Sequence, residues 1–107
     1  MSRPYPQLFP RQHDRLYIVY LLSCSDGSLY AGLTTDPDRR LREHNAGGPK
    51  GARYTRARRP VELVWQSEPL PDRSTAAALE WRLKQMTRRQ KLHWIQQHGE
   101  QQAIRGS

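Results

Sequence analysis

The stretch that decides the fold spans residues 16–33 and reads LYIVYLLSCSDGSLYAGL. Its first seven residues are apolar, aromatic or β-branched, which is typical of a β-strand. Ser25, Asp26 and Gly27 then form a turn signal, because glycine readily adopts the positive φ of the bulge that follows a type I turn. Residues 28–33 resume the strand pattern. The stretch therefore predicts an antiparallel β-hairpin.

The length of the turn decides which tyrosines share a face of the sheet. A three-residue loop at 25–27 places Leu22 opposite Tyr30, so that Tyr20 and Tyr30 lie on the same face. A two-residue loop would send the two tyrosines to opposite faces. Because a bulge at Gly27 favours the longer loop, we predict the shared face.

The segment after the hairpin predicts a helix. Asp36 is suited to cap its N-terminus, and Pro37 fits the first helical position, where no backbone N–H is needed. The predicted helix carries Arg40 and His44 and ends at the glycines of residues 47–48.

The second half of the chain predicts a strand and two more helices. Residues 61–65 (VELVW) are typical of a third strand, and apolar residues follow at helical spacing over 76–86. The sequence TRRQ at 87–90 is typical of a capping box that opens a last helix, in which we expect Leu92 and Ile95 to point inward.

These elements follow the order β-β-α-β-α-α and predict the fold class α+β, with a small three-stranded antiparallel sheet flanked by helices. We expect residues 1–14, which contain three prolines, to be a flexible N-terminal arm. Residues 15–98 form the predicted folded domain, and residues 99–107 a polar C-terminal tail.

Composition limits the class of protein. A chain of 107 residues is expected to form one core. No apolar run approaches the roughly 18–20 residues that cross a bilayer, and the N-terminus lacks the apolar stretch of a secretory signal, so we expect a cytoplasmic protein with no membrane partner. Cys24 is the only cysteine, which excludes an internal disulfide framework and a cysteine-based zinc site.

The net charge of +8 is concentrated in one segment. Between residues 39 and 59 the chain has eight basic residues and one acidic residue, Glu43. Arginine is the main cation, and its planar guanidinium suits bidentate contacts with phosphate. A local cluster of this kind predicts nucleic-acid binding more than it predicts mere solubility. The basic residues are Arg39, Arg40, Arg42, Lys50, Arg53, Arg56, Arg58 and Arg59.

Five residues outside the apolar pattern could carry chemistry. Each also has a structural interpretation: the tyrosines as half-buried strand residues, the arginine and histidine as one exposed helix face, and the glutamate as part of a surface i,i+4 pair with Lys84. Two alanines and a leucine flank the glutamate at helical spacing, so its carboxylate is expected at the edge of an apolar face, where a metal could be held. The five candidates are Tyr20, Tyr30, Arg40, His44 and Glu80.

Taken in order, these residues resemble the GIY-YIG nuclease domain. The two signatures appear as IVY at 18–20 and YAG at 30–32, with isoleucine in place of the first glycine and alanine in the middle of the second motif. Tyr20, Tyr30 and Arg40 stand ten residues apart, as the family pattern requires. The segments CSDGSLY at 24–30 and KGARYTR at 50–56 resemble the small, stand-alone bacterial branch of the family.

The resemblance implies metal-dependent hydrolysis of phosphodiester bonds in DNA, the chemistry of DNA repair or recombination. Glu80 would be the single protein ligand of Mg²⁺ or Mn²⁺, and Arg40 would bind the phosphate oxygens as negative charge builds. Tyr30 would hold the phosphate or the attacking water. Tyr20 and His44 are alternative acceptors for the proton of that water, and the sequence does not decide between them.

The basic segment would bind the DNA backbone through Arg39, Lys50, Arg53, Arg56, Arg58 and Arg59, and Tyr54 would be available to stack on a base. Stacking favours single-stranded, branched or damaged DNA over intact duplex, and RNA is not excluded. Two alternatives stay open: a catalytically silent, basic nucleic-acid-binding module, and a domain that docks on an acidic protein partner. The sequence predicts neither the oligomeric state nor the pathway.

Overall fold

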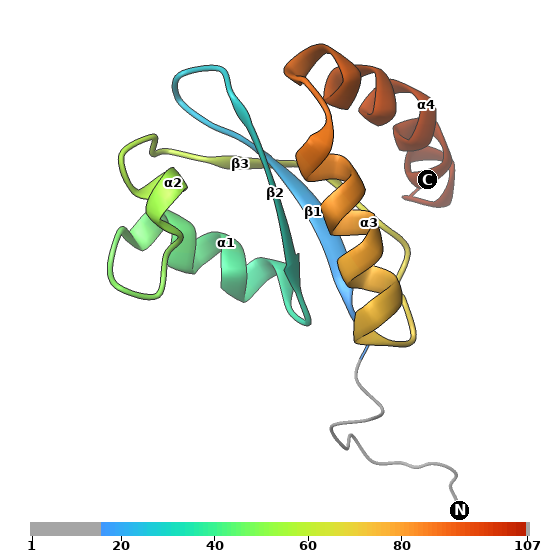
Figure 1. The fold of residues 1–107 in the computed structure, drawn as a ribbon, viewed down its shortest axis with the longest axis horizontal. Coiled ribbons are helices and arrows are strands. Elements are labelled where there is room, and N and C mark those ends of the chain that lie inside the picture. Colours follow the sequence, from blue (N-terminus) through green and yellow to red (C-terminus); the bar gives the residue numbers. More distant parts are fainter. Residues whose placement is uncertain (1–15, 107) are drawn as a thin grey trace, which may run out of the picture.

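A computed structural model describes residues 16–106, with side chains as far as Gly99. It contains one antiparallel sheet in the strand order β2-β1-β3, with four helices around it (Figure 1). This arrangement confirms the predicted α+β class. The predicted arm at residues 1–14 lies outside the described residues. The elements are β1 (Ile18–Ser23), β2 (Leu29–Thr34), α1 (Pro37–Ala46), α2 (Arg53–Arg56), β3 (Glu62–Gln66), α3 (Arg73–Gln85) and α4 (Arg88–Gly106).

The register of the hairpin confirms the three-residue loop. Leu22 pairs with Tyr30, Tyr20 pairs with Gly32, and Gly27 has a φ of 86°. Tyr20 covers the backbone of Gly32 so closely that a Cβ at that position would lie 2.2 Å from the phenol ring. Glycine at position 32 therefore leaves the space over β2 that the Tyr20 side chain occupies.

Each face of the sheet has its own core. On one face Val19, Leu21 and Trp65 pack with Ala76 and Leu83 of α3. On the opposite face Tyr20 and Leu22 belong to a second cluster that Leu41 of α1 also contacts. Figure 1 shows α1 and α2 on one side of the sheet and α3 and α4 on the other. Because β2 is an edge strand, residues of α1 and α3 can meet around that edge.

The predicted helix signals are present in the structure. The Asp36 carboxylate accepts a hydrogen bond from the backbone N–H of Arg39, and Gly47 ends α1 with a φ of 75°. In the capping box, the backbone N–H groups of Thr87 and Gln90 each donate to the other residue's side chain. Within residues 16–106, no helix combines the length and apolar character that crossing a membrane requires.

Three details differ from the prediction. The basic segment contains a short helix, α2, that the predicted element order does not include. Leu92 does not point inward: it is 42% exposed, while Trp94 and Ile95 pack on the core instead. Helix α4 continues to Gly106, so the predicted polar tail is largely helical.

Candidate active site

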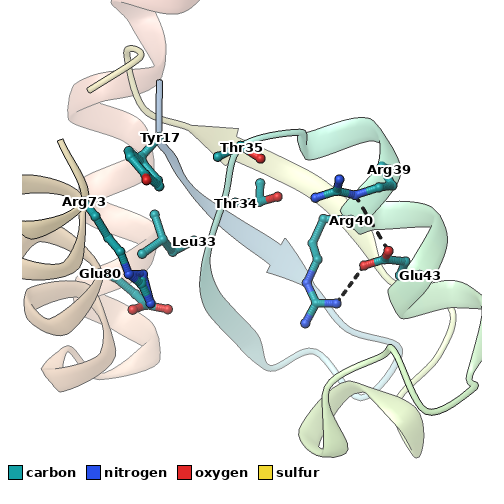
Figure 2. Close-up of a pocket in the computed structure, with 9 residues that line it drawn as sticks. All are labelled: Tyr17, Leu33, Thr34, Thr35, Arg39, Arg40, Glu43, Arg73 and Glu80. Carbon is teal, nitrogen blue, oxygen red and sulfur yellow. Dashed lines mark hydrogen bonds and ion pairs between the residues drawn. The ribbon is translucent and has the colours of Figure 1, made fainter. Parts of the chain in front are cut away.

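The five candidate residues come from four elements and converge at the β2 edge of the sheet. Tyr20 lies on β1, Tyr30 on β2, Arg40 and His44 on α1, and Glu80 on α3. A pocket of about 420 Å³ opens there, with Arg40 on its α1 wall and Glu80 on its α3 wall (Figure 2). The residues that line it are Tyr17, Leu33, Thr34, Thr35, Arg39, Arg40, Glu43, Arg73 and Glu80.

Arg40 is held in place by groups of its own wall. Its Nη1 donates to the Glu43 carboxylate at 2.9 Å and to the backbone carbonyl of Lys50. Arg39 also approaches Glu43, with 3.7 Å between Nε and Oε2. Glu43 therefore helps to orient Arg40 toward the pocket.

His44 is not on an exposed helix face, as one interpretation of the sequence had it. The side chain is fully buried and lies between Tyr20 and Thr55. His44 Nε2 is 2.9 Å from the Tyr20 hydroxyl, and Nδ1 is 2.7 Å from Thr55 Oγ1. These contacts join β1, α1 and α2 into one buried polar chain.

The direction of the hydrogen bonds follows from the end of this chain. Thr55 donates its hydroxyl proton to the backbone carbonyl of Ala52, at 3.1 Å. Thr55 Oγ1 therefore accepts from His44 Nδ1–H, which leaves Nε2 without a proton. The Tyr20 hydroxyl donates to Nε2. Thr55 thus selects the tautomer in which His44 can accept the proton of Tyr20.

Burial changes the pKa values of both His44 and Tyr20. Desolvation, reinforced by the charge of Arg40, lowers the pKa of His44 from 6.5 to about 4, so its imidazole is neutral at physiological pH. Desolvation raises the pKa of Tyr20 to about 12, although the neighbouring Arg40 guanidinium opposes the rise. Tyr20 is therefore a phenol and not a phenolate in this structure.

Glu80 has the properties of a single-carboxylate metal ligand. Its side chain is 22% exposed and forms an i,i+4 ion pair with Lys84 at 3.5 Å. Among the described residues no group of three or more His, Cys, Asp or Glu could enclose a metal ion. Mg²⁺ often binds through one or two carboxylates, with waters and substrate phosphate as its other ligands. The site fits that mode and does not fit a closed protein cage.

Tyr30 belongs to an aromatic group next to His44. Its ring lies edge-on to His44 with 5.5 Å between centroids, and it stacks on Tyr54 at 5.6 Å. The Arg58 guanidinium lies 3.9 Å from the centre of the Tyr54 ring. Tyr54 is 38% exposed, but a base that stacks on it has to compete with Arg58. Free stacking on Tyr54, expected from the sequence, therefore requires Arg58 to move.

The basic segment divides into structural and unengaged cations. Arg58 pairs with Asp26 at 2.9 Å, Arg59 donates to a backbone carbonyl of α2 at 2.8 Å, and Arg56 donates to the carbonyl of Gly51 at 3.4 Å. By contrast, the side chains of Lys50 and Arg53 make no hydrogen bond or ion pair with residues 16–99, whose side chains are described. Both are exposed and remain candidates for contact with phosphate.

Two residues of the site escaped the sequence analysis. Thr55 stands in the KGARYTR segment, which is the one signal that could have pointed to it. Arg73 stands in no motif of the sequence, and only the fold places it on the pocket wall.

Comparison with known proteins agrees with this geometry. Residues 16–100 match the GIY-YIG catalytic domain. A UPF0213 protein of Xanthomonas campestris is 51% identical over 81 residues, which cover 76% of each chain, and one of Streptococcus agalactiae is 51% identical over 78% of this chain and 92% of its own. The solution structure of a UPF0213 protein from Bacillus halodurans, 42% identical, superposes with a TM-score of 0.51 over 78% of this chain and 86% of that one.

The names of these relatives state no activity. The catalytic-domain match covers most of the chain and includes all five candidate residues, of which Arg40 and Glu80 line the pocket. The chain therefore belongs to the GIY-YIG nuclease superfamily, as a relative of its small UPF0213 proteins.

Proposed function

We propose that this protein is a divalent-metal-dependent endonuclease that hydrolyses phosphodiester bonds in DNA. The observation that carries the proposal is the buried chain Tyr20–His44–Thr55, whose Tyr20 end interacts with Arg40. Arg40 lines one wall of a pocket whose other wall holds Glu80. Proton acceptor, phosphate-binding cation and metal ligand are the three parts that phosphodiester hydrolysis needs. The superfamily supports a nucleic acid as substrate.

The chain's own residues suggest how a water molecule is activated. A water in the pocket attacks the phosphorus as the bond from phosphorus to the 3′ oxygen breaks. Its proton passes to the Tyr20 oxygen while the Tyr20 proton passes to His44 Nε2. Tyr20 and His44 then act in series, so the choice between them that the sequence left open does not arise. His44 can accept because Nε2 is unprotonated in the resting protein, where burial lowers the pKa of the ring to about 4 and so makes it a weak base. The negative charge of a bound phosphate raises its affinity for a proton.

Arg40 and Glu80 act on the charge of the reacting phosphate. Arg40, already oriented by Glu43, binds the non-bridging oxygens as negative charge builds on them. Glu80 would hold Mg²⁺ or Mn²⁺. When bound, the ion supplies Lewis acidity at the phosphate and neutralises the leaving 3′ oxygen. Tyr30, whose ring lies edge-on to His44, would orient the water or the phosphate.

We favour single-stranded, branched or damaged DNA as the substrate. Lys50 and Arg53 offer unengaged positive charge, and Trp81 offers an aromatic surface one residue after Glu80. Trp81 is 64% exposed, the highest exposure among the large apolar side chains of the described residues. An unpaired base next to the pocket can stack on such a ring, whereas a base inside a duplex cannot.

Replacing Trp81 with alanine is expected to weaken binding of single-stranded DNA about 5- to 100-fold, since stacking of one base is worth roughly 1–3 kcal/mol. Binding of duplex DNA should change little, and Trp81→Phe should restore most of the loss. Fluorescence anisotropy with labelled oligonucleotides measures all three. Leu92→Ala, at another exposed apolar residue, is the matched control. Equal losses on single-stranded and duplex DNA would contradict a stacking role.

The proposed function is tested by incubating the full chain with labelled single-stranded, duplex and branched DNA and with RNA. Each reaction contains Mg²⁺, Mn²⁺ or EDTA. Internal cleavage of DNA that requires the metal supports the proposal. Binding without cleavage under every condition would overturn it in favour of a silent binding module, and a preference for RNA would correct the substrate.

A further inference from the structure

Arg73 is the arginine of the pocket that no carboxylate engages. It is the first residue of α3, it is exposed, and it lines the pocket on the wall opposite Arg40. Its guanidinium makes no hydrogen bond or ion pair with residues 16–99, the part of the chain whose side chains the structure describes. The other two arginines of the pocket, Arg39 and Arg40, both approach Glu43.

The position of Arg73 is tied to that of Glu80. The two residues are seven apart in α3, which is about two turns, so both project from the same face of the helix. Figure 2 shows the Arg73 side chain extending along this face toward Glu80. The helix that supplies the candidate metal ligand therefore supplies an unneutralised cation beside it.

The two walls differ in the charge that they present to a substrate. On the α1 wall, Glu43 offsets part of the charge of Arg40. On the α3 wall, the Glu80 carboxylate pairs with Lys84, and Arg73 makes no ion pair with a residue whose side chain the structure describes. A DNA strand has a phosphate at every nucleotide, so a strand whose scissile phosphate lies between Arg40 and Glu80 places a neighbouring phosphate farther along α3.

We propose that Arg73 binds the phosphate next to the scissile one and so positions the DNA strand along α3. This inference rests on the proposed nuclease function and adds a second phosphate subsite to it. Arginine suits the role because its planar guanidinium donates two parallel hydrogen bonds to phosphate oxygens. Since the contact exists in the bound substrate as well as in the transition state, it governs KM and not kcat.

The test compares Arg73→Gln, Arg73→Lys and Arg89→Gln with the wild-type chain. Arg89 is an exposed arginine of α4 that lies in a different pocket, so Arg89→Gln controls for the loss of one positive charge. KM and kcat are measured for a single-stranded oligonucleotide, and binding is measured in EDTA over a series of salt concentrations. Circular dichroism confirms that each variant is folded.

Arg73→Gln is expected to raise KM about tenfold with kcat nearly unchanged. It should also make the plot of log K against log salt shallower by about 0.7, the value for one phosphate contact on a single strand. Arg73→Lys should restore the salt slope but only part of the KM, because an ammonium group lacks the bidentate geometry.

A slope and a KM that match those of Arg89→Gln would overturn the assignment while leaving the nuclease function intact. A fall in kcat at unchanged KM would overturn it too, because it would place Arg73 on the scissile phosphate. If the wild type cuts no substrate, the proposed function fails, and the salt slope for binding still decides whether Arg73 contacts a phosphate.

Discussion

Replacing Glu80 with glutamine will reduce DNA cleavage by on the order of 10³-fold or more. The metal is expected to stabilise the transition state by several kcal/mol, and each 1.36 kcal/mol corresponds to a factor of ten in rate. Glutamine keeps the size and polarity of the side chain but removes the charge that holds the ion. Among the described residues, Glu43 is the other carboxylate that lines the pocket, and it pairs with two arginines, Arg39 and Arg40.

The same substitution should leave the fold intact. Glu80 loses only its ion pair with Lys84, an i,i+4 pair whose partner is largely exposed and which is worth about 0.3–0.5 kcal/mol. Cleavage rates over a series of Mg²⁺ concentrations, together with thermal unfolding, separate the two effects. Glu62→Gln, at an exposed glutamate of β3, is the matched control and should cut like the wild type. A Glu80→Gln variant that retains metal-dependent cleavage would show that the ion binds elsewhere.

The sequence predicted the fold well because its decisive signals are local. Gly27 determines the length of the hairpin loop, and the loop length determines which strand residues face each other. The Asp36 cap and the capping box at 87–90 mark helix ends within a few residues. Each of these signals depends on neighbours in the chain, which a reader of the sequence can see. The shared face of Tyr20 and Tyr30 followed from them.

What the sequence could not predict depends on contacts between distant segments. Thr55 becomes important only because α2 folds against α1 and brings its hydroxyl to His44, eleven residues earlier in the chain. Arg58 covers the Tyr54 ring and so reduces its availability for stacking. Arg58 also pairs with Asp26 on the hairpin turn, which is far from it in the sequence. Arg73 stands in no motif of the sequence, and only the fold places it on the pocket wall opposite Arg40. No local pattern contains these pairings.

Replacing Tyr20 with phenylalanine should lower kcat by about 10²- to 10⁴-fold, the usual contribution of a general base. The phenyl ring preserves the edge contact with His44, whose centroid lies 5.9 Å away, and still fills the space over Gly32. The variant loses only the hydroxyl that links the pocket to His44 Nε2. Leaving that buried nitrogen without a donor should cost about 1–3 kcal/mol of unfolding free energy, which denaturant unfolding will measure.

Thr55→Val distinguishes a proton relay from a merely structural hydrogen bond. This variant retains the Tyr20 hydroxyl but removes the group that fixes the His44 tautomer, so kcat should fall about tenfold while KM stays near the wild-type value. A structural role alone would lower stability in both variants and leave their kcat, measured below the unfolding temperature, close to that of the wild type.

The pH dependence of the cleavage rate decides between a proton relay and a purely structural role for His44. Burial lowers the pKa of His44 to about 4, so the imidazole is a neutral acceptor above that value and a protonated, inactive group below it. The wild-type rate should therefore lose activity, through this group, only as the pH falls through about 4, and not near the ordinary histidine value of 6.5. Because a bound phosphate raises the proton affinity of His44, the acid limb of kcat should lie above that of kcat/KM. A Tyr20→Phe variant that cuts within a few-fold of the wild type, with an unchanged acid limb, would exclude the relay and leave His44 as a buried structural residue.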